Sequence, residues 1–179
     1  MGLVVDANIV TGFFQESVLD KCHGLSASPA PIFDPATRVH QIFVDDQGII
    51  EHEWRSGVQR EWFDAWFTDL IRDGNVREIA APSEALLRKE LRTLGFPATG
   101  RDIWYVRVSS AVASDAGFCV LVSEDLDFYE PKEKKCSSGR RATILHHELG
   151  RVRKHLKNTR SILVKPVDRF VDEYPDLLK

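Results

Sequence analysis

The fold of this protein is decided at Leu3-Val4-Val5-Asp6-Ala7-Asn8, close to the start of the chain. Three consecutive apolar residues have the composition of a short strand that is buried on both faces, and Asp6 ends the run. Apolar residues then recur at helical spacing over residues 8–19, and Asn8 is a residue type that favours a helix N-cap. The stretch therefore predicts a buried strand followed at once by a helix, with an aspartate at the junction.

A second apolar run ends in the same way. Residues 118–122 are entirely apolar, and Ser123-Glu124-Asp125-Leu126-Asp127 follows them directly. This run predicts a second buried strand, with Cys119 in the core. Shorter runs predict strands at 42–44 and 162–164.

Helical periodicity covers most of the remaining chain. The strongest apolar stripe spans residues 58–71 and is rich in tryptophan, which at this spacing indicates core packing rather than base stacking. Further helices are predicted at 83–95, 102–114 and 166–178, and a loop at 26–35. In the first of these helices Ser83 is the expected cap, and the leucines expected to face inward are Leu86, Leu87, Leu91 and Leu94.

Strands and helices thus alternate with few tight hairpins. Asp45-Asp46-Gln47-Gly48 predicts a turn, after which Ile49-Ile50 either returns as a strand or begins the next helix. This alternation predicts an α/β protein with three α/β/α layers and a mainly parallel central sheet. The 179 residues suit a single domain.

The composition narrows the class of protein. With 43% hydrophobic and 28% charged residues the chain is typical of a globular protein. No apolar run approaches the ~18–20 residues of a membrane span, and the start of the chain does not resemble a signal peptide. The cysteines, Cys22, Cys119 and Cys136, are odd in number and lack metal-ligand spacing, so a reducing compartment, the cytoplasm, is expected.

Acidic residues follow both buried strands. In a parallel sheet the site lies beyond the carboxyl ends of the strands, where Asp6, Asp125 and Asp127 are expected to converge. Glu51, Glu53 and Asp102, each near a helix start, are candidates to join them, although each acid alone is more typical of a turn or a cap. Crowded carboxylates repel one another unless a cation lies between them, and oxygen ligands favour Mg²⁺ or Mn²⁺ over zinc.

Several motifs resemble those of PIN-domain nucleases, in the same order along most of the chain. The first is Val4-Val5-Asp6-Ala7-Asn8, the second is Glu53 in Ile50-Glu51-His52-Glu53-Trp54, and the third is Asp102 at the start of a helix with small residues. The fourth is Ser123-Glu124-Asp125-Leu126-Asp127-Phe128, and Ile162-Leu163-Val164-Lys165-Pro166 resembles the closing strand of the family. Each motif alone is weak, but their order and flanking strands make the resemblance specific.

The resemblance implies a PIN-like fold and metal-dependent hydrolysis of phosphodiester bonds, commonly in single-stranded or structured RNA. It implies the catalytic residues Asp6, Glu53, Asp102 and Asp125, with Mg²⁺ or Mn²⁺ held by Asp6, Asp102, Asp125 and Asp127. Asn8 and Ser123 would orient the Asp6 carboxylate, and Glu51 is the alternative to Glu53 as the second acid. Short PIN proteins are often toxins of toxin–antitoxin pairs, so an antitoxin or another protein partner and an oligomer are further expectations.

Residues 129–160 form a basic insertion, longer than the connection that the family usually has here. It contains ten Lys or Arg against three Glu, a formal charge of +7 in a chain whose total is −3. Such a run is often a solvated helix face, but it could also contact the phosphates of a nucleic acid without reading sequence, or dock an acidic partner. The candidates for phosphate contact are Lys132, Lys134, Lys135, Arg140, Arg141, Arg151, Arg153, Lys154 and Lys157.

Three rival interpretations remain. A haloacid-dehalogenase-like phosphatase needs a second aspartate where this chain has Asn8. A zinc site at His146, His147 and His155, with or without Cys136, lacks finger or metalloprotease spacing. A PIN-like module that binds RNA or a partner without catalysis is the strongest alternative, although all the acid positions are occupied.

Overall fold

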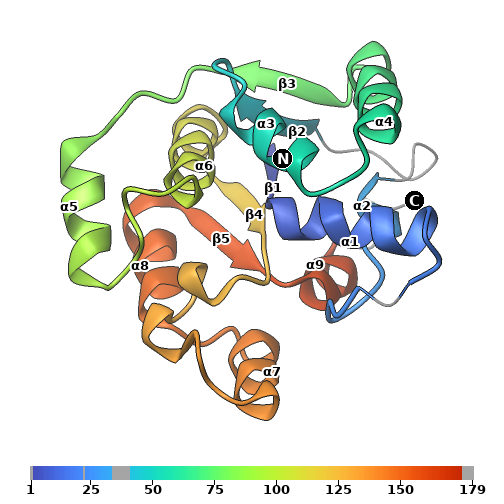
Figure 1. Ribbon diagram of the computed structural model, residues 1–179. Helices are drawn as coiled ribbons and strands as arrows, with labels where there is room; N and C mark the ends of the chain where they lie inside the picture. Colours follow the sequence, from blue (N-terminus) through green and yellow to red (C-terminus); the bar gives the residue numbers. More distant parts are fainter. Residues whose placement is uncertain (1, 22, 34–40, 175–179) are drawn as a thin grey trace.

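A computed structural model describes residues 2–21, 23–33 and 41–174 and places a five-stranded sheet at the centre of the molecule (Figure 1). The strands lie in the order β3-β2-β1-β4-β5, and every neighbouring pair is parallel. Their bounds are β1 Gly2–Val5, β2 Gln41–Asp45, β3 Val76–Ile79, β4 Cys119–Val122 and β5 Ile162–Lys165. The predicted α/β class with a mainly parallel sheet is confirmed.

Helices cover both faces of the sheet and complete three α/β/α layers. Figure 1 shows α5, α6 and α8 on one side and α1, α4 and α9 on the other. The bounds are α1 Ala7–Ser17, α2 Ala30–Phe33, α3 Ile49–Ser56, α4 Arg60–Arg72, α5 Ala85–Thr93, α6 Asp102–Ala116, α7 Ser138–His146, α8 Arg151–Arg160 and α9 Val167–Glu173, with short 3-10 turns η1 Leu126–Phe128 and η2 Pro131–Glu133. None of the helices in the described ranges is long and apolar enough to cross a bilayer.

The central strands are buried on both faces, as their continuous apolar composition predicts. All four residues of β1 and of β4 are buried, and Cys119 is in the core, where burial raises the pKa of its thiol to about 12. The tryptophan-rich stripe also packs inward. Helix α4 buries Phe63 and Phe67, while Trp62 and Trp66 stack at 5.1 Å between ring centroids and lie against Phe13 of α1.

The two alternatives after the Asp45 turn are resolved in favour of a helix. The Asp45 carboxylate accepts hydrogen bonds from the backbone N–H groups of Ile49, at 2.9 Å, and Ile50, at 2.8 Å. These bonds satisfy the first backbone N–H groups of α3, whose N-cap is Gly48, and no strand returns at this point. The other predicted strands and the helices at 58–71 and 102–114 are present with ends shifted by a few residues.

Several local predictions were wrong. Asp6, not Asn8, is the N-cap of α1, because β1 ends at Val5 and α1 begins at Ala7, which leaves one extended residue between them. Strand β3 was missed because this edge strand has two exposed central residues and no apolar run. The predicted loop at 26–35 contains α2, which buries Ile32.

The ends of two helices also differ from prediction. Glu84 is the N-cap of α5, and Leu86 is 63% exposed because the helix packs through Leu87 and Leu91, one turn apart. Helix α9 begins at Val167 and ends at Glu173, before residue 174, which is described and not helical. Residues 34–35 of the predicted loop, residues 175–178 of the predicted last helix, and Cys22 lie outside the described residues.

Candidate functional site

The parallel pairing of β1 and β4 brings the residues after both strands together. Val5 lies opposite Val122, and the Asp6 backbone N–H continues the ladder by donating to the Val122 carbonyl at 3.0 Å. The strand order reverses between β1 and β4, and such a switch point opens a crevice beyond the carboxyl ends of a sheet.

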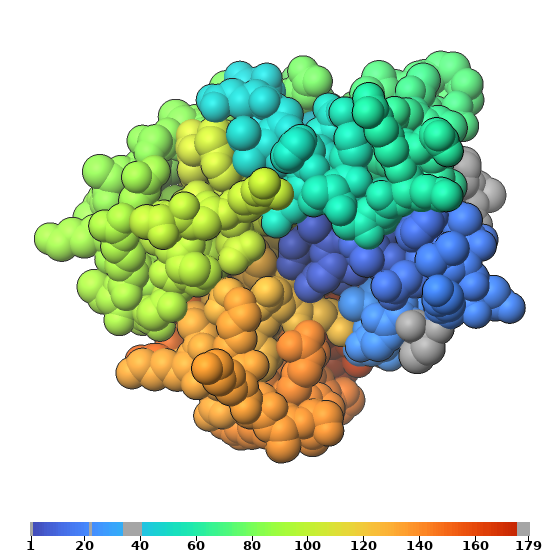
Figure 2. Space-filling model, viewed as in Figure 1, coloured from blue at the N-terminus to red at the C-terminus, as the bar shows by residue number. Residues whose placement is uncertain are grey.

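Figure 2 looks onto this edge of the sheet. The dark-blue start of the chain lies at the bottom of a hollow, between teal residues of α3 and α4, yellow-green residues near the start of α6, and the orange basic insertion. Segments that are far apart in sequence therefore meet around the residue that follows β1.

Ser123 holds the Asp6 carboxylate in place. The Ser123 hydroxyl donates to Asp6 Oδ2 at 2.5 Å and accepts from the Asp125 backbone N–H at 3.0 Å. The Tyr129 hydroxyl, fully buried below, donates to the Ser123 carbonyl at 2.9 Å. The structure thus assigns to Ser123 the orienting contact that the sequence suggested.

Asp6 is unusually placed for an acid. Its side chain is buried, with the residue only 6% exposed, and this burial raises its pKa to about 8. The Ser123 hydrogen bond opposes the rise, and the negative charges of Asp125, Asp102 and Glu53 add to it. Four acids from four elements therefore act on one another electrostatically at this edge.

The pKa of Asp102 is also raised, in part by the charges of the neighbouring acids. Its pKa is raised to about 6, mainly by burial and also by the charges of Asp125, Glu53 and Asp127, while Lys134 opposes the rise. Asp102 lies in the first turn of α6, the helix that packs across β1, β2 and β4. Its place at the cluster follows from that packing.

Glu53, rather than Glu51, faces the other acids. The neighbouring indole N–H of Trp54 donates to the Val5 carbonyl at 3.1 Å, which fixes α3 beside the end of β1. Burial raises the pKa of Glu53 and its Oε2 atom is buried without a hydrogen bond within the described chain. Glu51 instead forms an ion pair with Arg55 at 2.8 Å.

Tyr105 is a member of the site that sequence reasoning missed. It follows Asp102 by three positions on α6, so both side chains lie on one helix face. It is fully buried, and burial together with the Asp6 and Glu53 charges raises its pKa well above the usual tyrosine value. Its hydroxyl lies close enough to the Glu53 carboxylate to lower the Glu53 pKa, although no hydrogen bond of good geometry joins it to a described residue. The three-residue spacing from Asp102 was the available signal.

Asp125 and Asp127 hold a lysine of the basic insertion. Asp125 caps η1 by accepting from the Asp127 backbone N–H at 2.9 Å. The Lys134 ammonium contacts the buried Asp127 carboxylate and lies 3.8 Å from Asp125 Oδ1. Lys134, a candidate for phosphate contact, therefore lies in the acid cluster itself.

The oxygen atoms of this site are the type of ligand that a hard divalent cation prefers, but the described side chains are spread too widely to bind one ion as they stand. Among the residues that the structure describes, no three His, Cys, Asp or Glu side chains are grouped closely enough to ligate one ion. The site nevertheless offers only oxygen donors, and Asn8 Oδ1, like Glu53 Oε2, is buried without a hydrogen-bond partner in the described ranges. A cation would offset both the burial and the mutual repulsion that raise the pKa values of Asp6 and Asp102.

Most arginines of the basic insertion make contacts within the protein. Arg151 pairs with Glu130 at 2.7 Å, Arg153 pairs with Glu148, and Arg140 approaches Glu133 at 3.4 Å. Arg141 donates to the Glu124 carbonyl at 2.5 Å. The candidates that are exposed and form no ion pair in the described part of the chain are Lys132, Lys135, Lys154 and Lys157.

Neither protein-family models, nor curated proteins, nor solved structures match this chain.

Proposed function

We propose that this protein is a metal-dependent nuclease of the PIN-domain type, which hydrolyses phosphodiester bonds in RNA with Mg²⁺ or Mn²⁺ bound at the acid cluster. The observation that carries the proposal is the meeting of Asp6, Glu53, Asp102 and Asp125 at the switch point of the sheet, where burial and mutual repulsion raise the pKa of Asp6 to about 8. Holding several acids close together in a buried place is unfavourable when they are charged, and the binding of a cation would offset this electrostatic free energy.

The residues have distinct parts in such a reaction. Asp6, Asp102 and Asp125 would hold the ion, with Asp127 next to them, and Ser123 keeps Asp6 Oδ2 in one orientation. When bound, Mg²⁺ or Mn²⁺ supplies a water of lowered pKa and neutralises negative charge on the phosphoryl group. Glu53, whose Oε2 atom is buried and makes no hydrogen bond of good geometry to the described residues, would accept the proton of the attacking water. Hydrolysis consumes one water and leaves a phosphomonoester and a free hydroxyl.

The substrate class follows from the resemblance of the motifs. The family commonly cleaves single-stranded or structured RNA, so RNA is the proposed substrate, and a role as the toxin of a toxin–antitoxin pair belongs to the same proposal. The proposed compartment is the cytoplasm, because the cysteines are odd in number and lack metal-ligand spacing. An antitoxin would be an additional partner, for which the exposed lysines of the basic insertion offer a surface.

The test is cleavage of labelled single-stranded RNA and DNA with Mg²⁺, with Mn²⁺ and with EDTA. We expect cleavage of RNA with either metal, none with EDTA, and a loss of at least about 100-fold in Asp6→Asn and Asp102→Asn, as for groups that act directly in catalysis. Glu51→Gln is the matched control. Because Glu51 pairs with Arg55 rather than with the acid cluster, this variant should cleave RNA as the wild type does.

One observation favours a second function, a module that binds RNA or a protein partner without catalysis. The Lys134 ammonium already neutralises part of the Asp125 and Asp127 charge, so the cluster has an internal cation. If the protein binds RNA but shows no cleavage and no thermal stabilisation by millimolar Mn²⁺, the non-catalytic function is correct and the nuclease proposal is wrong.

A further inference from the structure

Helix α5 separates its charges between two faces. Leu87 and Leu91 are buried against the core, and the acids of the helix point toward α8. There Arg160 pairs with Glu84 at 2.9 Å, and His155 Nε2 lies 3.3 Å from Glu90. The acidic side chains of α5 are therefore engaged with α8, and its basic side chains remain on the outer face.

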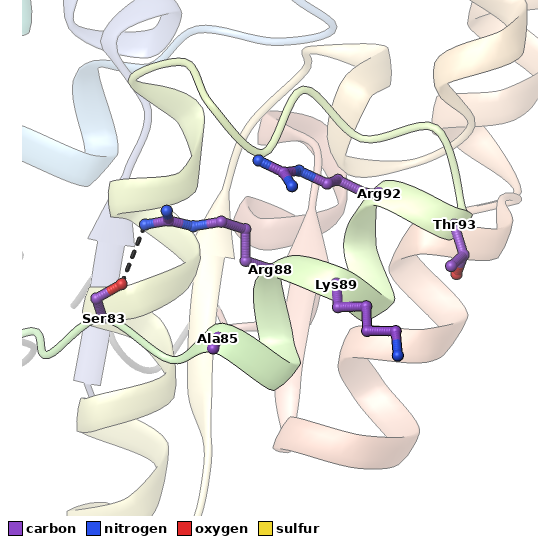
Figure 3. A pocket seen from close by; sticks show the side chains of 6 residues that line it. All are labelled: Ser83, Ala85, Arg88, Lys89, Arg92 and Thr93. Atoms are coloured by element: carbon purple, nitrogen blue, oxygen red, sulfur yellow. Dashed lines mark hydrogen bonds between the residues drawn. The ribbon is translucent and has the colours of Figure 1, made fainter.

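This outer face forms a groove with a volume of about 490 Å³. It is lined by Ser83, Ala85, Arg88, Lys89, Arg92 and Thr93 (Figure 3). Figure 3 shows the Arg88 and Arg92 side chains extending to the same side of α5, one turn apart, while Lys89 points away from them. Two guanidinium groups and two hydroxyl-bearing residues thus border one groove.

The positive charge of the groove is not compensated within the described chain. Arg88 donates to the Ser83 hydroxyl at 3.0 Å, but none of Arg88, Lys89 and Arg92 forms an ion pair with any carboxylate of residues 2–21, 23–33 and 41–174. Arg88 is also close enough to Arg107 that its charge, after burial, lowers the Arg107 pKa. This contrasts with the arginines of the basic insertion, which have partners inside the protein.

The groove is connected to the acid cluster by a short segment of chain. Residues 94–101 run from the end of α5 to Asp102 at the start of α6. Arg101, the last of them, lies near enough to Glu53 for its charge to lower the Glu53 pKa. Positively charged side chains therefore lie in the groove, at Arg101 at the end of this segment, and at Lys134 beside the acid cluster.

We infer that the α5 groove binds the phosphate backbone of a nucleic-acid strand whose neighbouring segment enters the acid cluster. Arginine guanidinium groups pair with phosphate through two parallel hydrogen bonds, and Lys89 adds a point charge. Such contacts give affinity without sequence readout and offset the repulsion between the acid cluster and a polyanion. The inference rests on the proposed nuclease function but concerns a surface separate from the catalytic acids.

The test measures binding without cleavage. Fluorescence anisotropy in EDTA follows a mixed-sequence single-stranded RNA of about 20 nucleotides, longer than the ~4–16 that one domain usually covers. In the double variant Arg88→Ala/Arg92→Ala we expect Kd to rise about tenfold or more, and the salt dependence to flatten by about 1.4 in log–log slope, or ~0.7 for each lost contact to a single strand. Arg88→Lys/Arg92→Lys should recover part of the affinity, because charge returns without the paired hydrogen bonds.

The matched control removes the same charge elsewhere. Lys21→Ala/Arg77→Ala changes two exposed cations, which like Arg88 and Arg92 form no ion pair in the described ranges, and should leave Kd and slope unchanged. If Arg88→Ala/Arg92→Ala binds RNA like the wild type, the groove inference is wrong, and RNA cleavage by the wild type would still support the nuclease proposal. If RNA binding depends on Arg88 and Arg92 but the wild type never cleaves RNA, the nuclease proposal is wrong and RNA binding by the groove still stands.

Competitors identify the ligand chemistry. Inorganic phosphate and a nucleoside monophosphate should displace the RNA weakly, because each occupies one contact. If either binds with an affinity equal to that of the RNA and loses it in Arg88→Ala/Arg92→Ala, the ligand is a small phosphate compound and the inference is wrong. If polyglutamate of similar length competes as well as RNA does, the groove is a surface for an acidic protein, which equally overturns it.

Discussion

Asp6 combines two properties at the scale of one residue: it is nearly inaccessible, and it is surrounded by other acids. The folded protein retains its proton up to a pKa of about 8, whereas the unfolded chain loses it near 3.8. Between these values the folded state binds more protons than the unfolded state, so the Asp6 contribution to the free energy of unfolding falls as pH rises. Asp6 therefore destabilises the metal-free protein most at pH 8 and above.

Asp6→Asn should remove this pH dependence. Asparagine does not titrate and can still accept the Ser123 hydrogen bond, so we expect the variant to be more stable than the wild type at pH 8 by about 1–3 kcal/mol, with the difference vanishing near pH 4. Chemical denaturation in EDTA at several pH values measures it. A variant less stable than the wild type at pH 8 would show that Asp6 is a structural residue. Glu51→Gln, which removes an acid outside the cluster, should show no such trend.

Lys134 is the second residue whose surroundings predict a measurable effect, in this case on the affinity for metal ions. Its ammonium contacts Asp127 and lies near Asp125, where it competes with a metal ion for the same oxygens. Lys134→Ala should tighten Mn²⁺ binding several-fold in calorimetric titration, because Asp125 and Asp127 lose their internal cation. Lys135→Ala, at an exposed neighbour with no ion pair in the described ranges, is the control. Weaker Mn²⁺ binding in Lys134→Ala would mean that Lys134 supports the site.

At the scale of the elements, Gly150 allows the chain to approach Tyr129 closely at the start of α8. Gly150, directly before α8, has φ +135, and a Cβ added there would lie 2.2 Å from the Tyr129 carbonyl oxygen. The same carbonyl accepts the Val152 backbone N–H at 3.0 Å, which fixes the first turn of α8 against the residues that follow β4. A side chain at Gly150 would therefore disturb both the backbone conformation and this contact.

Gly150→Ala should lower the free energy of unfolding by about 2–4 kcal/mol, because both a disfavoured φ and a backbone clash oppose it. Gly139→Ala is the matched control within the same insertion. Gly139 lies in α7 with nothing within 4 Å of an added Cβ, so alanine there should be neutral or stabilising by up to about 1 kcal/mol. Urea denaturation of both variants compares them, and equal stabilities would contradict the role given to Gly150.

At the scale of the whole molecule, the acid cluster exists only when the sheet has formed. Its members follow β1, lie on α3, begin α6 and follow β4, so an ion that binds them binds the folded state and stabilises it by linkage. Binding must also displace protons from Asp6 and Asp102, whose pKa values are raised to about 8 and about 6. Metal affinity should therefore increase as pH rises through this range.

Thermal melting checks this expectation. Millimolar Mn²⁺ should raise Tm by a few degrees at pH 8 and by less at pH 6, and Asp125→Asn should reduce the rise, since mass action stabilises the folded state by about 2.7 kcal/mol at 100 times Kd. Mg²⁺ should act in the same direction. A Tm rise that is larger at pH 6 than at pH 8 would contradict a site made of these acids.

Local patterns in the sequence determined much of this protein. The apolar runs at β1 and β4 require burial on both faces, and the stripe of α4 requires one packed side, so strands, helices and the parallel class follow from near neighbours in the chain. The acids after β1 and β4 could likewise be predicted to share one edge of the sheet, since that is where parallel strands end. The edge strand β3, half exposed, carries too weak a pattern to be found.

Only the tertiary structure decided which side chains meet. Glu51 and Glu53 are equivalent in sequence, but Trp54 bonds to Val5 and turns Glu53 toward the acids. Nothing local indicates that Lys134 contacts Asp127, or that Arg88 and Arg92 of α5 lack carboxylate partners among the described residues. Contacts of this kind depend on which faces of distant elements pack together, whereas strand and helix patterns depend on residues only a few positions apart.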